Sequence, residues 1–229
     1  MAERQPFPIG DTTNGQVVQV SDALRPIPVR GGGLPVPTID FLWKASYEGK
    51  VFVAGDADQN DVVTGQTSFA NTTPTLMLDV PDGINCIPLF VDLMQTGTVA
   101  GGDIELLFEI DRVDRYSSGG TSEKVFSSMM GGPKNKVACY SGATAVAGYG
   151  MTLSRYDLAP DVSPAEGAVN KPFWTPPYPV ILRGPAAFLI YSSAGATGPT
   201  WFWNIGWIEL TDAELANYLG VYFPDSPGV

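Results

Sequence analysis

Glycine and proline set the first constraint on the fold, because together they make up about a fifth of the chain. The 229 residues include 26 glycines and 20 prolines, whereas the two residues usually account for about 12% of a globular protein. Proline interrupts helices and central strands, and glycine favours turns. We therefore expect many turns and few long helices. A chain of this length can fold as one domain with a substantial core.

Hydrophobic residues at every second position predict β-strands. In the segment 103–114, Ile104, Leu106 and Phe108 alternate with acidic residues, which predicts a strand with one buried and one solvated face. Pro88 interrupts another apolar segment and indicates a bulge or an unpaired side. The other expected strands are apolar segments at 50–54, 75–80, 84–94, 136–140, 150–153, 180–183, 186–191 and 200–210.

These strands follow one another without intervening helices, so we expect an antiparallel β-sandwich, specifically a single jelly roll. We place an extended N-terminal arm at residues 1–40, the β-sandwich domain at 41–210, and a short helix with a C-terminal tail at 211–229. The capping box Thr-Asp-Ala-Glu at 211–214 predicts that this helix runs from Asp212 to Leu219.

The arm is defined by prolines, which fix the backbone in extended conformations and remove hydrogen-bond donors. Two interpretations stay open: a flexible tail, or an arm that reaches across a neighbouring subunit. The arm contains three glycines at 31–33 and prolines at positions 6, 8, 26, 28, 35 and 37.

The composition excludes several functional classes. The chain has no histidine, which excludes a Ser-His-Asp triad, a Cys-His dyad and imidazole metal ligands. A formal charge of −11 argues against binding to nucleic acid or an anionic membrane. Cys86 and Cys139 do not form a Cys-x-x-Cys motif, and we expect no disulfide. We also expect no secretory signal, because residues 1–6 lack an apolar region.

An acidic segment is the one candidate metal site. Asp56, Asp58, Asn60 and Asp61 offer oxygen ligands at closely spaced positions, as in the opening of a calcium loop. Asp61 stands where an EF-hand has glycine, and Thr67 stands where it has glutamate. A weak calcium site and a solvated acidic turn therefore both remain open.

The acidic face of the 103–114 segment does not predict glycosidase chemistry. Glu105 and Glu109 are four residues apart, which is about 13 Å along a strand, whereas paired catalytic carboxylates lie about 5–9.5 Å apart. We expect this face to be solvated or to contact another subunit. We assign no catalytic residue and no cofactor.

The tryptophans form the second candidate site. Trp201, Trp203 and Trp207 share one face of the last strand. They predict a core or interface layer, because tryptophan buries a large area and anchors interfaces. Sugar stacking on exposed rings is the alternative. The interface and aromatic candidates together are Trp43, Trp174, Trp201, Trp203 and Trp207.

Three sequence blocks resemble a known family. They are Tyr47–Phe52, the turn-containing block Val80–Asn85 and the strand block Gly184–Tyr191, followed by a closing aromatic strand at 201–209. In this order they are similar to the small virion structural proteins of environmental tailed bacteriophages. The similarity covers residues 43–55, 75–95 and 178–210, and the turn here is Pro-Asp-Gly where that family has Pro-Ala-Gly.

The resemblance implies a non-enzymatic β-sandwich of a virus particle, either a capsid component or a decoration protein. Its expected partners are itself, as a trimer or higher homo-oligomer, and other virion proteins, with no nucleic acid and no membrane. Its expected location is the virion, after assembly in the host cytoplasm. A carbohydrate-binding or fibre module of the same particle is the alternative.

Overall fold

The computed structural model describes residues 41–56, 62–96, 103–159, 170–195 and 197–219. The chain divides into two units after Lys44, and every strand of the described residues lies in the second unit. The expected arm at 1–40 and the tail at 220–229 lie outside the described residues. Helix α1 (Phe41–Tyr47) precedes the first strand, in a place where no helix was expected.

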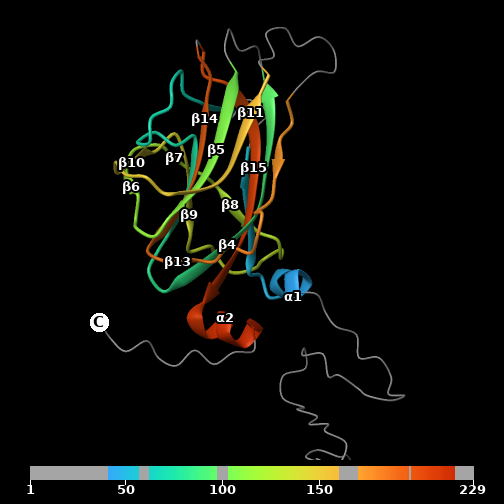
Figure 1. Ribbon diagram of the computed structural model, residues 1–229. Coiled ribbons are helices and arrows are strands. Elements are labelled where there is room, and N and C mark those ends of the chain that lie inside the picture. Colours follow the sequence, from blue (N-terminus) through green and yellow to red (C-terminus); the bar gives the residue numbers. More distant parts are fainter. Residues whose placement is uncertain (1–40, 57–61, 97–102, 160–169, 196, 220–229) are drawn as a thin grey trace, which may run out of the picture. The chain divides into compact units, whose positions relative to one another are not determined.

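Two antiparallel sheets form the body of the second unit (Figure 1). Sheet A has the order β12 (Phe173–Trp174), β4 (Ile84–Thr96), β15 (Thr200–Thr211), β1 (Val51–Gly55), β8 (Val125–Ser127), with β13 (Leu182–Arg183) on β4 and β2 (Val63–Thr64) on β15. Sheet B has the order β11 (Met151–Leu158), β5 (Ile104–Asp111), β14 (Ala186–Ser193), β3 (Leu76–Val80), β9 (Ala138–Ser141), β7 (Thr121–Ser122). A small third sheet pairs β10 (Thr144–Ala145) with β6 (Tyr116–Ser118). The expected all-β antiparallel sandwich is confirmed.

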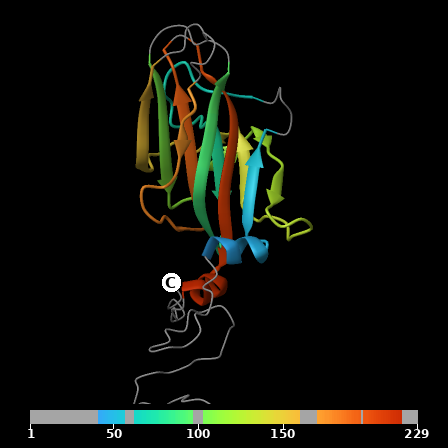
Figure 2. The same ribbon diagram turned by 90° about the vertical axis from the view of Figure 1, so that its right-hand side faces the viewer.

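The strand pairs follow a nested order. Strand β1 pairs with β15, β3 with β14, β4 with β12, and β5 with β11. Two further pairs, β4 with β15 and β5 with β14, join these four pairs of strands into the two sheets. Figure 2 shows the resulting neighbours β4, β15 and β1 side by side.

The core lies between the two sheets and is rich in aromatic side chains. Trp201, Trp203 and Trp207 are 0–2% exposed, as their alternation along β15 requires. Trp174 stacks on Phe108 with ring centroids 4.8 Å apart, which joins the edge strand β12 to β5 of the opposite sheet. Buried aromatic rings of this size contribute much of a core's hydrophobic stabilisation.

The two cysteines also lie in this core. Both are buried and neither forms a disulfide, as the sequence predicts. Burial raises the pKa of the Cys86 thiol well above its ordinary value, and the nearby Glu209 adds to that effect. Both thiols are therefore neutral at physiological pH and act as small apolar side chains.

The bulge expected at Pro88 is present in the long β4–β15 pair. The register shifts between Gly206 and Trp207, which pair with Phe90 and Pro88 respectively. Leu89 is therefore the extra residue of the bulge. Gly206 lets the Phe90 ring approach closely, because a Cβ at this position would lie 2.3 Å from a ring carbon.

Helix α2 (Asp212–Leu219) has the predicted bounds. Its capping box is formed: the Glu214 amide donates to Thr211 Oγ1 at 3.3 Å, and the Thr211 amide donates to Glu214 Oε2 at 2.8 Å. Leu215 fixes the helix by packing with Ile208 and Leu210 on the outer face of sheet A. Among the described residues, no helix has the length and hydrophobicity needed to cross a bilayer.

Candidate functional site

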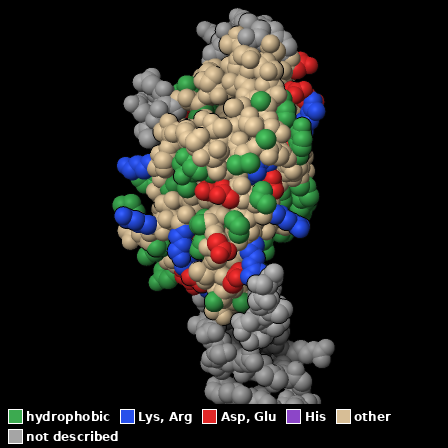
Figure 3. All heavy atoms as spheres, turned by 90° about the vertical axis from the view of Figure 1, so that its left-hand side faces the viewer, with side chains coloured by type: hydrophobic (Ala, Val, Ile, Leu, Met, Phe, Trp, Pro, Cys, Tyr) green, Lys and Arg blue, Asp and Glu red, His purple; other side chains and the backbone are tan. Residues whose placement is uncertain are grey.

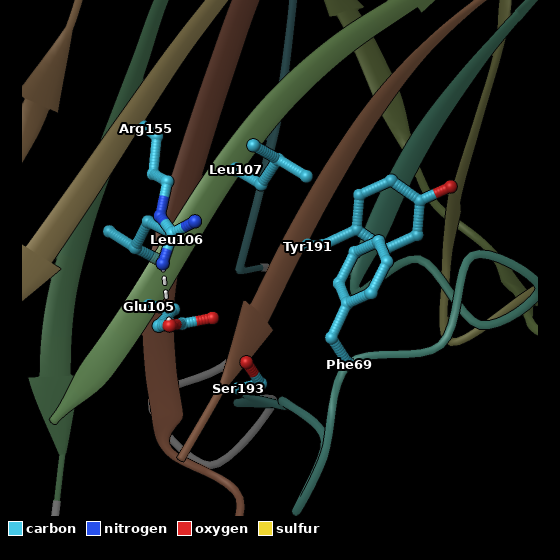
Figure 4. A pocket seen from close by; sticks show the side chains of 7 residues that line it. All are labelled: Phe69, Glu105, Leu106, Leu107, Arg155, Tyr191 and Ser193. Atoms are coloured by element: carbon cyan, nitrogen blue, oxygen red, sulfur yellow. Dashed lines mark hydrogen bonds and ion pairs between the residues drawn. The ribbon is translucent and has the colours of Figure 1, made fainter. Parts of the chain in front are cut away.

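A groove with a volume of about 270 Å³ lies on the outer face of sheet B. Its floor comes from outward-facing side chains that the strand register places side by side. Tyr191 of β14 lies opposite Leu107 of β5, and Ser193 lies opposite Glu105. Strand β11 adds Arg155 next to Leu107, and the segment between β2 and β3 adds Phe69 as a wall (Figure 4).

The aromatic wall of the groove is held in place by hydrogen bonds. The buried Tyr191 donates its hydroxyl proton to the Asn71 carbonyl at 2.9 Å. Phe69 meets the Tyr191 ring edge-on, with centroids 5.2 Å apart, and remains 43% exposed. The segment that carries Phe69 is anchored where the Gln66 amide donates to the Ser192 carbonyl at 2.7 Å. Phe69 thus presents an apolar ring on a fixed support.

The polar wall is a pair of opposite charges. Arg155 donates to Glu105 at 2.7 Å and to Asp157 at 3.2 Å, and all three side chains are about half exposed. These two carboxylates raise the pKa of Arg155, Asp157 having the larger effect. A solvent-exposed pair of this kind contributes little to stability. Its exposed donors and acceptors line the same groove as the Phe69 ring.

Burial raises the pKa of Tyr191 at the groove floor to about 12. Tyr191 therefore keeps its proton at physiological pH and serves as a donor, not as a base. The groove can accordingly bind by ring contact and hydrogen bonding. Its volume lies near the lower end of the range for small-molecule pockets.

Arg115 connects strand β5 of sheet B to the loops that contain Asn71, Val146 and Gly148. Its side chain is 2% exposed. The guanidinium donates to Asp111 Oδ2 at 2.7 Å and to the carbonyls of Val146, Asn71 and Gly148 at 2.7, 3.2 and 3.1 Å. One planar cation therefore ties three loop carbonyls to the end of β5.

The acidic face of β5 differs from the expectation at one position. Glu109 was expected to be solvated or to contact another subunit, but it is 5% exposed within the chain itself. Burial raises its pKa, and Arg115, the Gly150 amide and the Thr152 hydroxyl partly offset that effect. The strand alternation correctly placed Glu109 on the outer face, but it could not show that β11 and the loops cover this position. Glu105, by contrast, is partly exposed in the groove.

The predicted metal ligands are only partly described. Asp56 follows β1, and its Oδ2 accepts a hydrogen bond from the Trp203 amide at 2.9 Å. Asp58, Asn60 and Asp61 lie outside the described residues, so the calcium hypothesis stays a prediction. Within the described ranges, no three histidine, cysteine or acidic side chains come close enough to bind a metal ion.

The five candidate tryptophans separate into two groups. Trp174, Trp201, Trp203 and Trp207 are buried in the core. Their burial shows that these four rings belong to the core of the chain. The sugar-stacking alternative is therefore wrong for them, because a ligand cannot reach a buried ring. Trp43 of α1 is 74% exposed. The groove residues Phe69 and Arg155 were missed, because neither has a local sequence pattern and only the sheet register brings them together.

Comparisons with known proteins identify no relative. No family model matches the chain, and neither curated proteins nor solved structures yield a significant match.

Proposed function

We propose that this protein is a structural subunit of a virus particle, a bacteriophage capsid component or decoration protein. In this role it acts by self-association and exchange of its N-terminal arm, and catalyses no reaction. The observation that carries the proposal is the nested strand order of the two sheets.

The nested order supports a jelly-roll interpretation. If β1, β3, β4, β5, β11, β12, β14 and β15 are numbered one to eight, the pairs are 1·8, 2·7, 3·6 and 4·5. This is one long antiparallel hairpin wound into two sheets, with the cross-pairs 3·8 and 4·7 completing them. Such two-sheet jelly rolls are used by viral capsid and lectin domains.

The charge distribution supports a position away from the genome. The chain carries a net charge of −11, and a surface that contacts packaged nucleic acid needs clustered lysine and arginine. Figure 3 views the side of the second unit that carries β6, β7, β9 and β10. Acidic and basic side chains are interspersed there with apolar ones.

The first test is assembly of the purified full-length chain. We expect light scattering after size-exclusion chromatography to show a discrete oligomer, and deletion of residues 1–37 to weaken assembly while circular dichroism stays β-type. Unchanged assembly after the deletion would contradict arm exchange. Mass spectrometry of purified particles tests the location: hundreds of copies per particle indicate a capsid role, and absence from the particles refutes the proposal.

A second candidate function is carbohydrate binding at the sheet B groove. One observation favours it: the exposed Phe69 ring and the Glu105–Arg155 pair line the same groove (Figure 4), and sugars are bound by ring stacking combined with planar hydrogen-bonding groups. A glycan array tests this function. The variant Phe69→Ala should lose any binding that the array detects, whereas Tyr149→Ala, at an exposed ring outside the groove, should retain it.

A further inference from the structure

The outer face of sheet A carries an apolar row that crosses all five strands of the main sheet order. The register pairs Phe126 of β8 with Val53 of β1, Val53 with Gly206 of β15, and Gly206 with Phe90 of β4. Phe173 of β12 completes the row by stacking on Phe90 with centroids 5.9 Å apart. We call these five residues the aromatic row.

The two ends of the aromatic row are the most accessible. Phe126 is 54% exposed and Phe173 is 59% exposed. At the centre, the Phe90 ring packs over Gly206, where a Cβ would lie 2.3 Å from a ring carbon. Apolar residues in a continuous line are unusual on a solvated sheet face, where single scattered ones are normal. The aromatic row therefore has the character of a contact surface.

The dimensions of the row fit a short extended peptide. Five strands spaced about 4.8 Å apart give a row about 19 Å long. A polyproline II segment rises about 3.1 Å per residue, so about six residues span it. Segments of this kind dock on aromatic surfaces at low entropic cost, because proline restricts them before binding.

The chain itself contains a matching segment outside the described residues. Residues 26–37 hold two Pro-x-Pro units, 26–28 and 35–37, with isoleucine or valine between the prolines. Arg25 and Arg30 are the only charged residues from 23 to 39, so this part of the arm is basic in a chain of net charge −11. Asp92 is exposed beside the row, where it pairs with Phe173 across the β4–β12 edge. Apolar and charge complementarity thus agree.

The attachment point of the arm lies on the same sheet face. Ala45 is fully buried against Val51, Ile208 and Leu210, which face outward from sheet A. The chain that precedes Ala45 therefore starts from this face in every copy. If the outer faces of sheet A of two copies oppose each other, both attachment points lie on the opposed faces, which is compatible with a reciprocal two-fold contact.

We propose that about six consecutive residues within the segment 26–37 of one copy bind in an extended conformation across the aromatic row of a second copy. This inference rests on the proposed self-association and specifies its contact surface: Phe126 and Phe173 contact the two ends of the bound stretch, and Asp92 pairs with Arg30.

Photocrosslinking of the full-length protein tests the contact directly. Phe126→p-benzoylphenylalanine and Phe173→p-benzoylphenylalanine are each irradiated in a mixture of ¹⁵N-labelled and unlabelled chains, with Tyr149→p-benzoylphenylalanine as control at an exposed ring. We expect the first two to give mixed-isotope crosslinks to peptides within 26–37, and the control to give none. Crosslinks confined to one copy, or directed elsewhere than to the arm, overturn the proposal.

Assembly measurements separate this inference from the proposed function. The double variant Phe126→Ser/Phe173→Ser should raise the dissociation constant of the oligomer by about tenfold or more, as the deletion of residues 1–37 does. Tyr149→Ser should assemble like the unmodified chain. If the deletion weakens assembly but the double variant does not, the aromatic row is the wrong surface and arm exchange stands. If the deletion has no effect, arm exchange itself fails.

Discussion

Replacing Asp79 with asparagine should stabilise the protein at alkaline pH. Asp79 points outward from β3, and burial together with the nearby Asp114 raises its pKa from 3.8 to about 6. Because the folded state binds this proton more tightly than the unfolded state, stability from this group is present at low pH. It is lost as the pH rises from about 4 to above 6.

The size of the effect follows from the shift. One pKa unit corresponds to about 1.4 kcal/mol, so the rise to about 6 sets an upper bound of about 3 kcal/mol. Asp79 is only partly buried, so solvent screening reduces the effect, and we expect about 1 to 2 kcal/mol. Asp79→Asn keeps the side-chain shape but removes the charge. At pH 8, the free energy of unfolding of the variant should therefore exceed that of the unmodified chain by this amount. The difference should vanish near pH 4.

Urea denaturation at pH 4, 6 and 8 measures this difference at one protein concentration. The carboxyl groups of Glu109 and Glu209 also have raised pKa values, mainly through burial. Both occur in the variant and the parent, so the difference isolates Asp79. Asp103→Asn removes an exposed carboxylate and should change stability by less than about 0.5 kcal/mol. Equal destabilisation by Asp79→Asn at all three pH values would refute the reasoning.

Three further predictions test the core, the cap of α2 and the buried Arg115. Trp203→Ala should lower the free energy of unfolding by about 3–5 kcal/mol, because the ring is buried between the sheets. The control Trp43→Ala, at an exposed ring, should lower it by less than about 0.5 kcal/mol. A similar loss from both substitutions would contradict the assigned core. Thr211→Ala removes the cap of α2 and should cost about 1 kcal/mol, seen as a lower urea midpoint; no change would mean that the capping box contributes nothing. Arg115→Met leaves Asp111 without its buried partner and should cost about 3 kcal/mol, with faster amide hydrogen exchange in the loops it holds; unchanged exchange would show that other contacts fix them.

The features that the sequence predicted well depend on neighbours within a few residues. The α2 bounds follow from a capping box of four residues, and the bulge follows from Pro88, which cannot donate to a ladder. The turn at Pro81–Gly83 needs positive φ at its glycine, and Gly83 has a φ of 75°. Alternation along β5 and β15 identified the inward faces for the same local reason.

Tertiary structure alone decided which outward positions are covered and which side chains meet. Glu105 and Glu109 each stand between two apolar residues of β5. Only Glu109 is buried, because β11 and the loops bound by Arg115 cover it. The groove and the aromatic row join residues that are distant in the chain, because antiparallel register places them side by side. Phe126 and Phe173 belong to opposite edges of one sheet, and no periodicity along a single strand encodes that arrangement.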